Sequence, residues 1–128
     1  MAESQDSPLS RAISRGDAGE IRSLVDAGAE LNQHGGLFGW TPLIHAAYSD
    51  QLDAVNLLIQ AGADLNLSDD SGNTALMTAA RKERREIVAA LIQAGANCAI
   101  VNNSGKSASD LSEDGVISDL IEKAMADS

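Results

Sequence analysis

The feature that most constrains the fold of this chain is a short motif that returns at nearly constant intervals. Ala-Gly-Ala occupies residues 27–29, 61–63 and 94–96. A second motif recurs at the same interval as the first. It is a glycine followed two positions later by a hydroxyl residue, and the hydroxyl residues, 33 positions apart, are Thr41, Thr74 and Ser107. A repeat of this length indicates one supersecondary unit that is used several times and stacked on itself.

Each unit has the pattern of two helices and a tight turn. Thr or Ser followed by Pro or Ala predicts a helix start, because the hydroxyl caps the first turn and the next residue suits it. After Thr41, apolar side chains recur from Leu43 at the helical spacing i, i+3 and i+4. A second apolar stretch follows and ends at Gly62, where a left-handed residue closes the last turn. The polar run 69–72 then predicts a turn before the next helix.

These residues resemble the ankyrin-repeat family, whose unit is a β-turn finger followed by two antiparallel helices. The family's Thr-Pro-Leu opening matches residues 41–43, and its Gly-Ala-Asp-x-Asn close matches residues 62–66. The resemblance implies an all-α fold, an ankyrin-repeat solenoid of helix–turn–helix units with β-turn fingers. We expect a flexible N-terminal tail and one ankyrin-repeat domain of four units: tail 1–6, domain 7–126, units at about 7–39, 40–72, 73–105 and 106–126.

Two positions in each middle unit depart from the family pattern. The family usually has His directly after Thr-Pro-Leu, where its ring bonds the Thr hydroxyl, but Ile44 and Met77 stand there. It usually has Gly at the turn between the two helices, where this chain has Asp50 and Glu83. A left-handed backbone strains Glu more than Asp. We therefore expect a modestly stable stack.

The charge of the chain argues against a nucleic acid partner. The formal net charge is −10 and the pI is about 4.3, so the field of the protein repels a phosphate backbone. The single cysteine, Cys98, cannot form an internal disulfide, and no Cys/His cluster surrounds it to hold zinc. No apolar run is long enough to span a bilayer. We expect a cytoplasmic protein that binds neither nucleic acid nor membrane and uses no metal or cofactor.

Catalysis needs a nucleophile, a base and an orienting group that converge in a pocket. The candidates are His34, His45 and Cys98, and the repeat places them in different units. His45 falls in the apolar stretch of a helix, where a structural role is favoured, and Cys98 is interpreted as a small structural residue. We expect a non-enzymatic protein, and an enzyme that uses His45 or Cys98 is the alternative from a different class.

Resemblance to ankyrin repeats implies a concave binding face made by the fingers and by the first helix of each unit. All aromatic residues of the chain, Phe38, Trp40 and Tyr48, fall on that face within one repeat. Aromatic side chains are frequent interface anchors because they bury much area at low entropic cost. A structural role for Trp40, in which it only covers the neighbouring finger, stays open beside the binding role.

Basic residues give a second signal. Four of the nine lie within five positions: Arg81, Lys82, Arg84 and Arg85. Arg81 and Lys82 follow an Ala-Ala pair, as Tyr48 and Ser49 do, so both are expected to face the groove. A partner with local negative charge beside an apolar side chain fits both features, and the acidic remainder of the surface would steer a basic partner.

The sequence thus predicts a monomeric protein–protein interaction module that holds one protein partner as an adaptor or inhibitor. A homo-oligomeric scaffold is the alternative among binding proteins. The predicted partner-binding residues lie on the fingers and the first helices: Leu37, Phe38, Trp40, Tyr48, Ser49, Asp70, Ser71, Asn73, Arg81 and Lys82.

Overall fold

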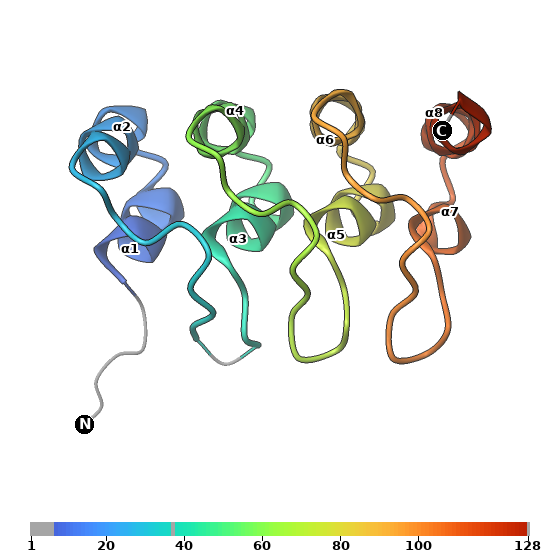
Figure 1. Cartoon of the computed structure of the whole chain (residues 1–128), viewed down its shortest axis with the longest axis horizontal. Coiled ribbons are helices and arrows are strands. Elements are labelled where there is room, and N and C mark those ends of the chain that lie inside the picture. Colours follow the sequence, from blue (N-terminus) through green and yellow to red (C-terminus); the bar gives the residue numbers. More distant parts are fainter. Residues whose placement is uncertain (1–6, 37, 128) are drawn as a thin grey trace.

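The chain folds into successive pairs of antiparallel helices (Figure 1). The computed structural model describes residues 7–36 and 38–127. Within these ranges the helices are α1 (Pro8–Arg15), α2 (Ala18–Asp26), α3 (Pro42–Tyr48), α4 (Leu52–Gln60), α5 (Ala75–Arg81), α6 (Arg85–Gln93), α7 (Ala108–Leu111) and α8 (Gly115–Asp127). The described residues form no strand beyond isolated bridges, and the prediction of an all-α fold is confirmed.

The helices lie in two layers (Figure 1). The first helices of the pairs, α1, α3, α5 and α7, form one row, and α2, α4, α6 and α8 form the other. Helix α3 packs between α1 and α5, and α4 packs between α2 and α6. The loops that join successive pairs extend away from both rows as fingers. Each pair therefore buries its apolar sides against its neighbours, as in a solenoid.

Hydroxyl side chains cap the first helices where the sequence predicts them. Thr41 and Thr74 each accept a hydrogen bond through Oγ1 from the N–H three residues later, at 3.2 and 3.3 Å. Ser107 and Asp110 form a reciprocal capping box at the start of α7. The predicted helix starts are confirmed, and each cap satisfies an amide that the helix itself leaves free.

The turns between helices use the left-handed backbone that the sequence predicts. Asp50 and Glu83 have φ of 58° and 60°, where the first unit has Gly16 at 69°. Gly62 follows the end of α4 with φ of 93°. A side chain at Asp50 or Glu83 is therefore held in a region that costs free energy for any residue with a Cβ.

The core consists of aliphatic side chains, and it includes both residues that replace the family's histidine. Ile44 and Met77 are 0% and 1% exposed. The apolar side chains at these positions thus contribute to the contacts between repeats. The largest fully buried side chains are Leu9, Ile13, Ile21, Leu43, Ile44, Leu58, Leu76, Met77, Ile87, Leu91, Ile117 and Ile121.

Asparagine side chains tie the loops of successive repeats together. Asn32 Oδ1 accepts a hydrogen bond from the N–H of Asp64 at 2.8 Å, and Asn66 Oδ1 accepts one from the N–H of Asn97 at 2.9 Å. The two bonds occupy equivalent places in neighbouring units. They fix the spacing of the loops from which the fingers begin.

The predicted unit boundaries fall between the helix pairs. The units at 7–39, 40–72, 73–105 and 106–126 each hold one pair, except that α8 extends to Asp127. These boundaries stay a prediction, and the expected tail at 1–6 lies outside the described residues.

Candidate functional site

The three aromatic residues stack into one ridge on the finger side of α3. The ring centroids of Phe38 and Trp40 are 5.5 Å apart, and those of Trp40 and Tyr48 are 4.8 Å apart. Phe38 is 60% exposed and Tyr48 is 37% exposed, whereas Trp40 is half-buried between them. The aromatic ridge, as we name Phe38, Trp40 and Tyr48, presents continuous apolar surface to solvent.

Backbone hydrogen bonds join successive fingers, including the one that carries Phe38. The N–H of Asp70 donates to the carbonyl oxygen of Phe38 at 3.0 Å, and the N–H of Asn103 donates to the carbonyl oxygen of Ser71 at 3.0 Å. Gly39 has φ of 70°, and any side chain there would collide with the Asp70 carboxylate. The left-handed backbone and the nearby Asp70 carboxylate both favour glycine at this position of the finger.

A pocket lies on each side of the ridge, and both share Phe38 and Trp40. The charged pocket, toward α5, has a volume of about 280 Å³ and is lined by Phe38, Trp40, Tyr48, Asp69, Asp70, Ser71, Asn73 and Arg81. The serine pocket, toward α1, has a volume of about 330 Å³ and is lined by Ser10, Ser14, Gly35, Gly36, Phe38, Trp40 and His45. Ridge and pockets together form a groove between the fingers and the first helices.

The four basic residues Arg81, Lys82, Arg84 and Arg85 have two kinds of position. Two of them bind neighbouring repeats, and the other two lie at the groove. Arg84 Nη2 donates to the carbonyl oxygen of Tyr48 at 2.9 Å, and Arg84 also pairs with Asp50 at 3.9 Å. Arg85 donates to both carboxylate oxygens of Asp114 at 2.8 and 3.2 Å. The side chains of Arg84 and Arg85 therefore join neighbouring repeats.

Arg81 and Lys82, in contrast, lie at the groove. The Lys82 ammonium is 4.7 Å from the centre of the Tyr48 ring, a cation–π contact. Arg81 is exposed and lines the charged pocket. The expectation that these two basic residues face the groove agrees with their positions.

Most of the predicted site residues come together in the structure. All but three of them line the charged pocket. Of those three, Lys82 contacts Tyr48, Ser49 is half-buried directly after it, and Leu37 lies outside the described residues. Whether these residues bind a partner stays a prediction.

The serine pocket and the role of Asp69 were not predicted from the sequence. Asp69 Oδ1 accepts hydrogen bonds from the N–H groups of Ser71 and Asn73, both at 2.9 Å, and so shapes the finger. Ser14 follows its helix cap Ser7 by seven residues, as Tyr48 follows Thr41. This equivalence could have placed Ser14 on the groove.

The candidates for catalysis, His34, His45 and Cys98, lie in three different helix–turn–helix units. His45 is half-buried, 3.3 Å from Ser14 Oγ, with its ring centroid 5.6 Å from that of Trp40. Burial raises the pKa of the Cys98 thiol, so the thiolate is disfavoured. Within residues 7–36 and 38–127, no three His, Cys, Asp or Glu side chains are grouped to hold a metal ion.

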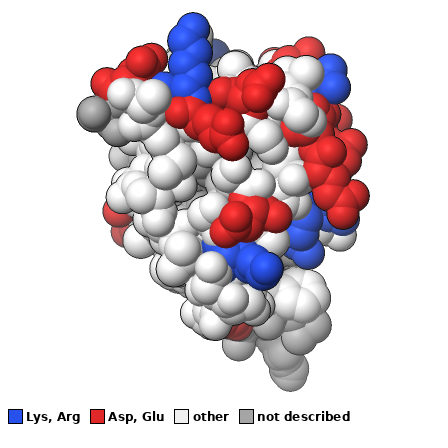
Figure 2. Space-filling model, turned by 90° about the vertical axis from the view of Figure 1, so that its right-hand side faces the viewer, with Lys and Arg blue, Asp and Glu red and all other residues white. Residues whose placement is uncertain are grey.

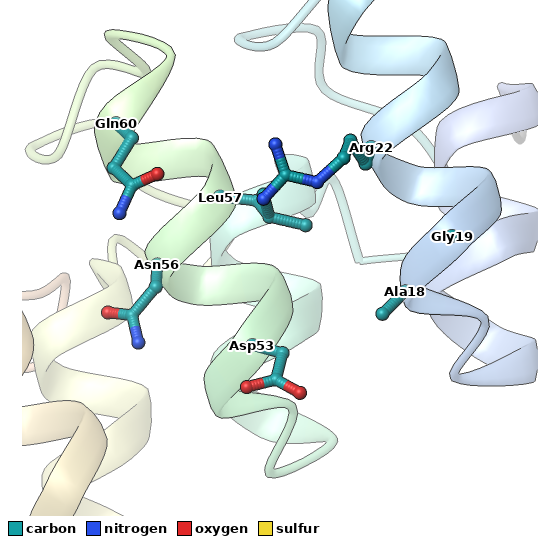
Figure 3. Close-up of a pocket in the computed structure, with 7 residues that line it drawn as sticks. All are labelled: Ala18, Gly19, Arg22, Asp53, Asn56, Leu57 and Gln60. Carbon is teal, nitrogen blue, oxygen red and sulfur yellow. The ribbon is translucent and has the colours of Figure 1, made fainter.

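Acidic side chains gather at the α7–α8 end of the molecule. Figure 2 views the molecule from the α7–α8 end, where acidic side chains gather along the upper part. A hollow of about 320 Å³ lies between α2 and α4, where Arg22 reaches across toward Leu57 (Figure 3). Ala18 and Gly19 line it from α2 together with Arg22. No helix of the described chain is both long and apolar enough to cross a membrane.

Comparison with known proteins identifies the family. A family model described as ankyrin repeats (3 copies) matches residues 9–102. The 2-5A-dependent ribonuclease of Mus musculus is 38% identical over 69 residues, which are 54% of this chain and 9% of the ribonuclease. Inversin of Homo sapiens is 36% identical over 69 residues, which are 54% of this chain and 6% of inversin. The chain thus spans only a small part of the length of these relatives.

A solved structure agrees with the fold. The crystal structure of the ankyrin repeat domain of Bcl-3, described as a unique member of the IkappaB protein family, matches with a TM-score of 0.85 and 26% identity, over 89% of this chain and 50% of that chain. The predicted solenoid is confirmed. The repeated motif, the helix pairs and these matches show that the chain belongs to the ankyrin-repeat family.

Proposed function

We propose that the groove binds a segment of a protein partner and that the aromatic ridge is its anchor. Ankyrin repeats are protein-interaction modules, and stacked repeats offer extended concave surfaces for partners. The observation that supports the ridge as the anchor is the 60% exposure of Phe38, which packs on Trp40 at a place where the core does not need it. Large aromatic side chains in such positions are typical binding hot spots.

A purely structural role explains only part of the ridge. Trp40 is half-buried and contacts rings on both sides, so it does cover the base of its finger. Phe38 adds no comparable burial. Its ring gains a favourable transfer free energy only when another surface covers it.

The mode of action that we propose is adaptor or inhibitor binding by a monomeric, cytoplasmic protein. The proposed binding set is the aromatic ridge with Leu37, Ser49, Asp70, Ser71, Asn73, Arg81 and Lys82. A net charge of −10 disfavours nucleic acid as the partner. Size-exclusion chromatography with light scattering tests the monomer, since a concentration-dependent dimer would favour the homo-oligomeric scaffold.

The test of the proposal is truncation of the ridge. We expect Phe38→Ala and Trp40→Ala each to weaken binding by about 2 kcal/mol or more, the level of a hot spot. The partner is obtained by affinity capture and mass spectrometry, and its affinity is then measured by calorimetry. The fluorescence of Trp40, the single tryptophan, should shift to the blue when the complex forms.

Val116→Ala is the matched control, because Val116 is 47% exposed on α8 and lies away from the groove. It should bind like the wild type. A Phe38→Ala variant with unchanged affinity would instead assign the ridge to the scaffold.

A further inference from the structure

We infer that the partner segment places a carboxylate side chain on Arg81, next to the apolar side chain that it lays on the aromatic ridge. This inference rests on the proposed function and specifies the chemistry of the partner. It makes Arg81 the residue that determines which segments the groove accepts.

Arg81 is the guanidinium that remains available at the groove. It is exposed and lines the charged pocket beside Tyr48, and within the described residues its guanidinium makes no hydrogen bond or ion pair. Arg84 and Arg85, close by in sequence, are held by Tyr48, Asp50 and Asp114. A guanidinium binds a carboxylate through two parallel N–H···O bonds, the strongest pairing open to Arg81.

Lys82 makes the same side of the ridge unfavourable for a cation. Its ammonium already lies over the Tyr48 ring at 4.7 Å. A lysine or arginine of the partner would have to displace it and would meet its charge. An anionic side chain beside the ring is attracted by Lys82 as well as by Arg81.

The carboxylates across the pocket favour a carboxylate over a phosphate. Asp69 is tied to the N–H groups of Ser71 and Asn73, and Asp70 packs against Gly39, so both remain part of the finger. Their two negative charges offset the positive charges of Arg81 and Lys82, so the second charge of a phosphate gains no net attraction at this pocket. Arg81 offers a single fork, which one carboxylate satisfies.

The groove sets where the acidic residue stands relative to the apolar one. Arg81 and Tyr48 line the same pocket, and the ridge forms its wall. An extended segment that crosses the ridge brings neighbouring side chains alternately to its two faces. The acidic residue is therefore expected within a few residues of the apolar anchor.

The experiment selects peptides from a displayed random library on the immobilised wild-type protein and sequences the binders. We expect Asp or Glu to be enriched near an aromatic or large aliphatic residue. The Arg81→Ala variant of the protein should bind a selected peptide about tenfold more weakly, as expected for the loss of a charge-assisted hydrogen bond. Arg81→Glu should select Lys or Arg at the position where the wild type selects an acid.

Arg22→Glu is the matched control, because Arg22 is exposed on α2 beside the hollow between α2 and α4 and the net charge changes equally (Figure 3). It should select the same peptides as the wild type. Circular dichroism checks that Arg81→Glu and Arg22→Glu keep the helical fold.

The outcomes separate this inference from the proposed function. Binders that depend on Trp40 but show no acidic enrichment would overturn the role of Arg81 and leave the ridge as the anchor. Binders that ignore both Trp40 and Phe38 would overturn the proposed function itself. Phosphoserine in place of the selected Asp or Glu should weaken binding, and tighter binding would overturn the preference for a carboxylate.

Discussion

The second and third repeats share a scaffold and differ on its surface. Both begin a helix after a threonine cap, and Leu43 and Leu76 are each 1% exposed at equivalent places behind those caps. The residues at equivalent groove positions differ completely: Phe38 against Ser71, Trp40 against Asn73, Tyr48 against Arg81, and Ser49 against Lys82. Buried positions repeat because each must fit its neighbour, whereas the groove positions are free to specify a partner.

The two repeats also differ in how they connect to their neighbours. Gln51 and Leu52 begin the second helix of one repeat, and Arg84 and Arg85 stand at the same places in the next. Arg84 reaches back to Tyr48, and Arg85 reaches forward to Asp114. The third repeat thus has two charged side chains that reach its neighbours, at the positions where the second repeat has Gln51 and Leu52.

The largest expected effect tests whether the two scaffolds are equivalent. Leu58 and Leu91 are both 0% exposed at matching positions of α4 and α6. We expect Leu58→Ala and Leu91→Ala each to lower the free energy of unfolding by about 2–5 kcal/mol, because each leaves a cavity between repeats. Urea unfolding followed by far-UV circular dichroism measures both.

Similar losses from the two variants would support a shared scaffold. If one variant loses several times more free energy of unfolding than the other, the two scaffolds are not equivalent and one repeat carries most of the stability. A far-UV spectrum dominated by strand signal would contradict the helical fold itself.

A smaller effect is expected at the turns, where both repeats have a residue with a Cβ in a left-handed backbone. Glu83→Gly should raise the free energy of unfolding by up to about 1 kcal/mol, because glycine relieves the strain but loses more chain entropy on folding. Asp50→Gly should raise it less, since Asp tolerates this region better and since Asp50 also pairs with Arg84.

Thermal or urea unfolding of the two glycine variants provides the measurement. Gly16, already glycine at the same turn of the first unit, shows that the fold accepts the substitution. A Glu83→Gly variant less stable than the wild type would mean that the glutamate makes a compensating contact.

Local rules were enough to predict the scaffold from the sequence. Each predicted feature depends on residues that are only a few positions apart. The structure has all of them: the caps at Thr41 and Thr74, the left-handed turns at Asp50 and Glu83, and the end of α4 before Gly62. The gathering of most predicted site residues around one pocket followed from the repeat geometry.

Contacts between side chains of different repeats could not be predicted in the same way. The pairing of Arg85 with Asp114 spans 29 residues and depends on which rotamer each side chain adopts. The serine pocket was not predicted because its lining residues come from three places in the chain: helix α1, the finger that carries Phe38 and Trp40, and His45 of α3. Periodicity places a residue on a face but does not say which neighbour its side chain reaches.

The smallest expected effect concerns the charged contact that distinguishes the third repeat from the second. The hydrogen bond from Arg85 lowers the pKa of Asp114, and the N–H groups of Val116 and Ile117 lower it further. A carboxyl whose pKa is lower in the folded state stabilises the fold fully above its unfolded pKa, about 3.9, and loses this contribution as the pH falls through the folded value. Asp114→Asn keeps a side chain that can cap α8 and removes the charge.

We therefore expect Asp114→Asn to be less stable than the wild type at pH 7, with a difference that stays constant down to about pH 5 and shrinks below about pH 4. Urea is the denaturant for this measurement, because guanidinium salt would screen the pair. The difference between the two proteins is the quantity to follow, since protonation of the many other carboxyl groups also relieves the repulsion of a chain with net charge −10.

Asp50→Asn, at the longer 3.9 Å pair with Arg84, is the matched control and should change the urea midpoint less. Equal, pH-independent shifts in both variants would mean that the third repeat gains nothing specific from its charges and that its contacts resemble those of the second.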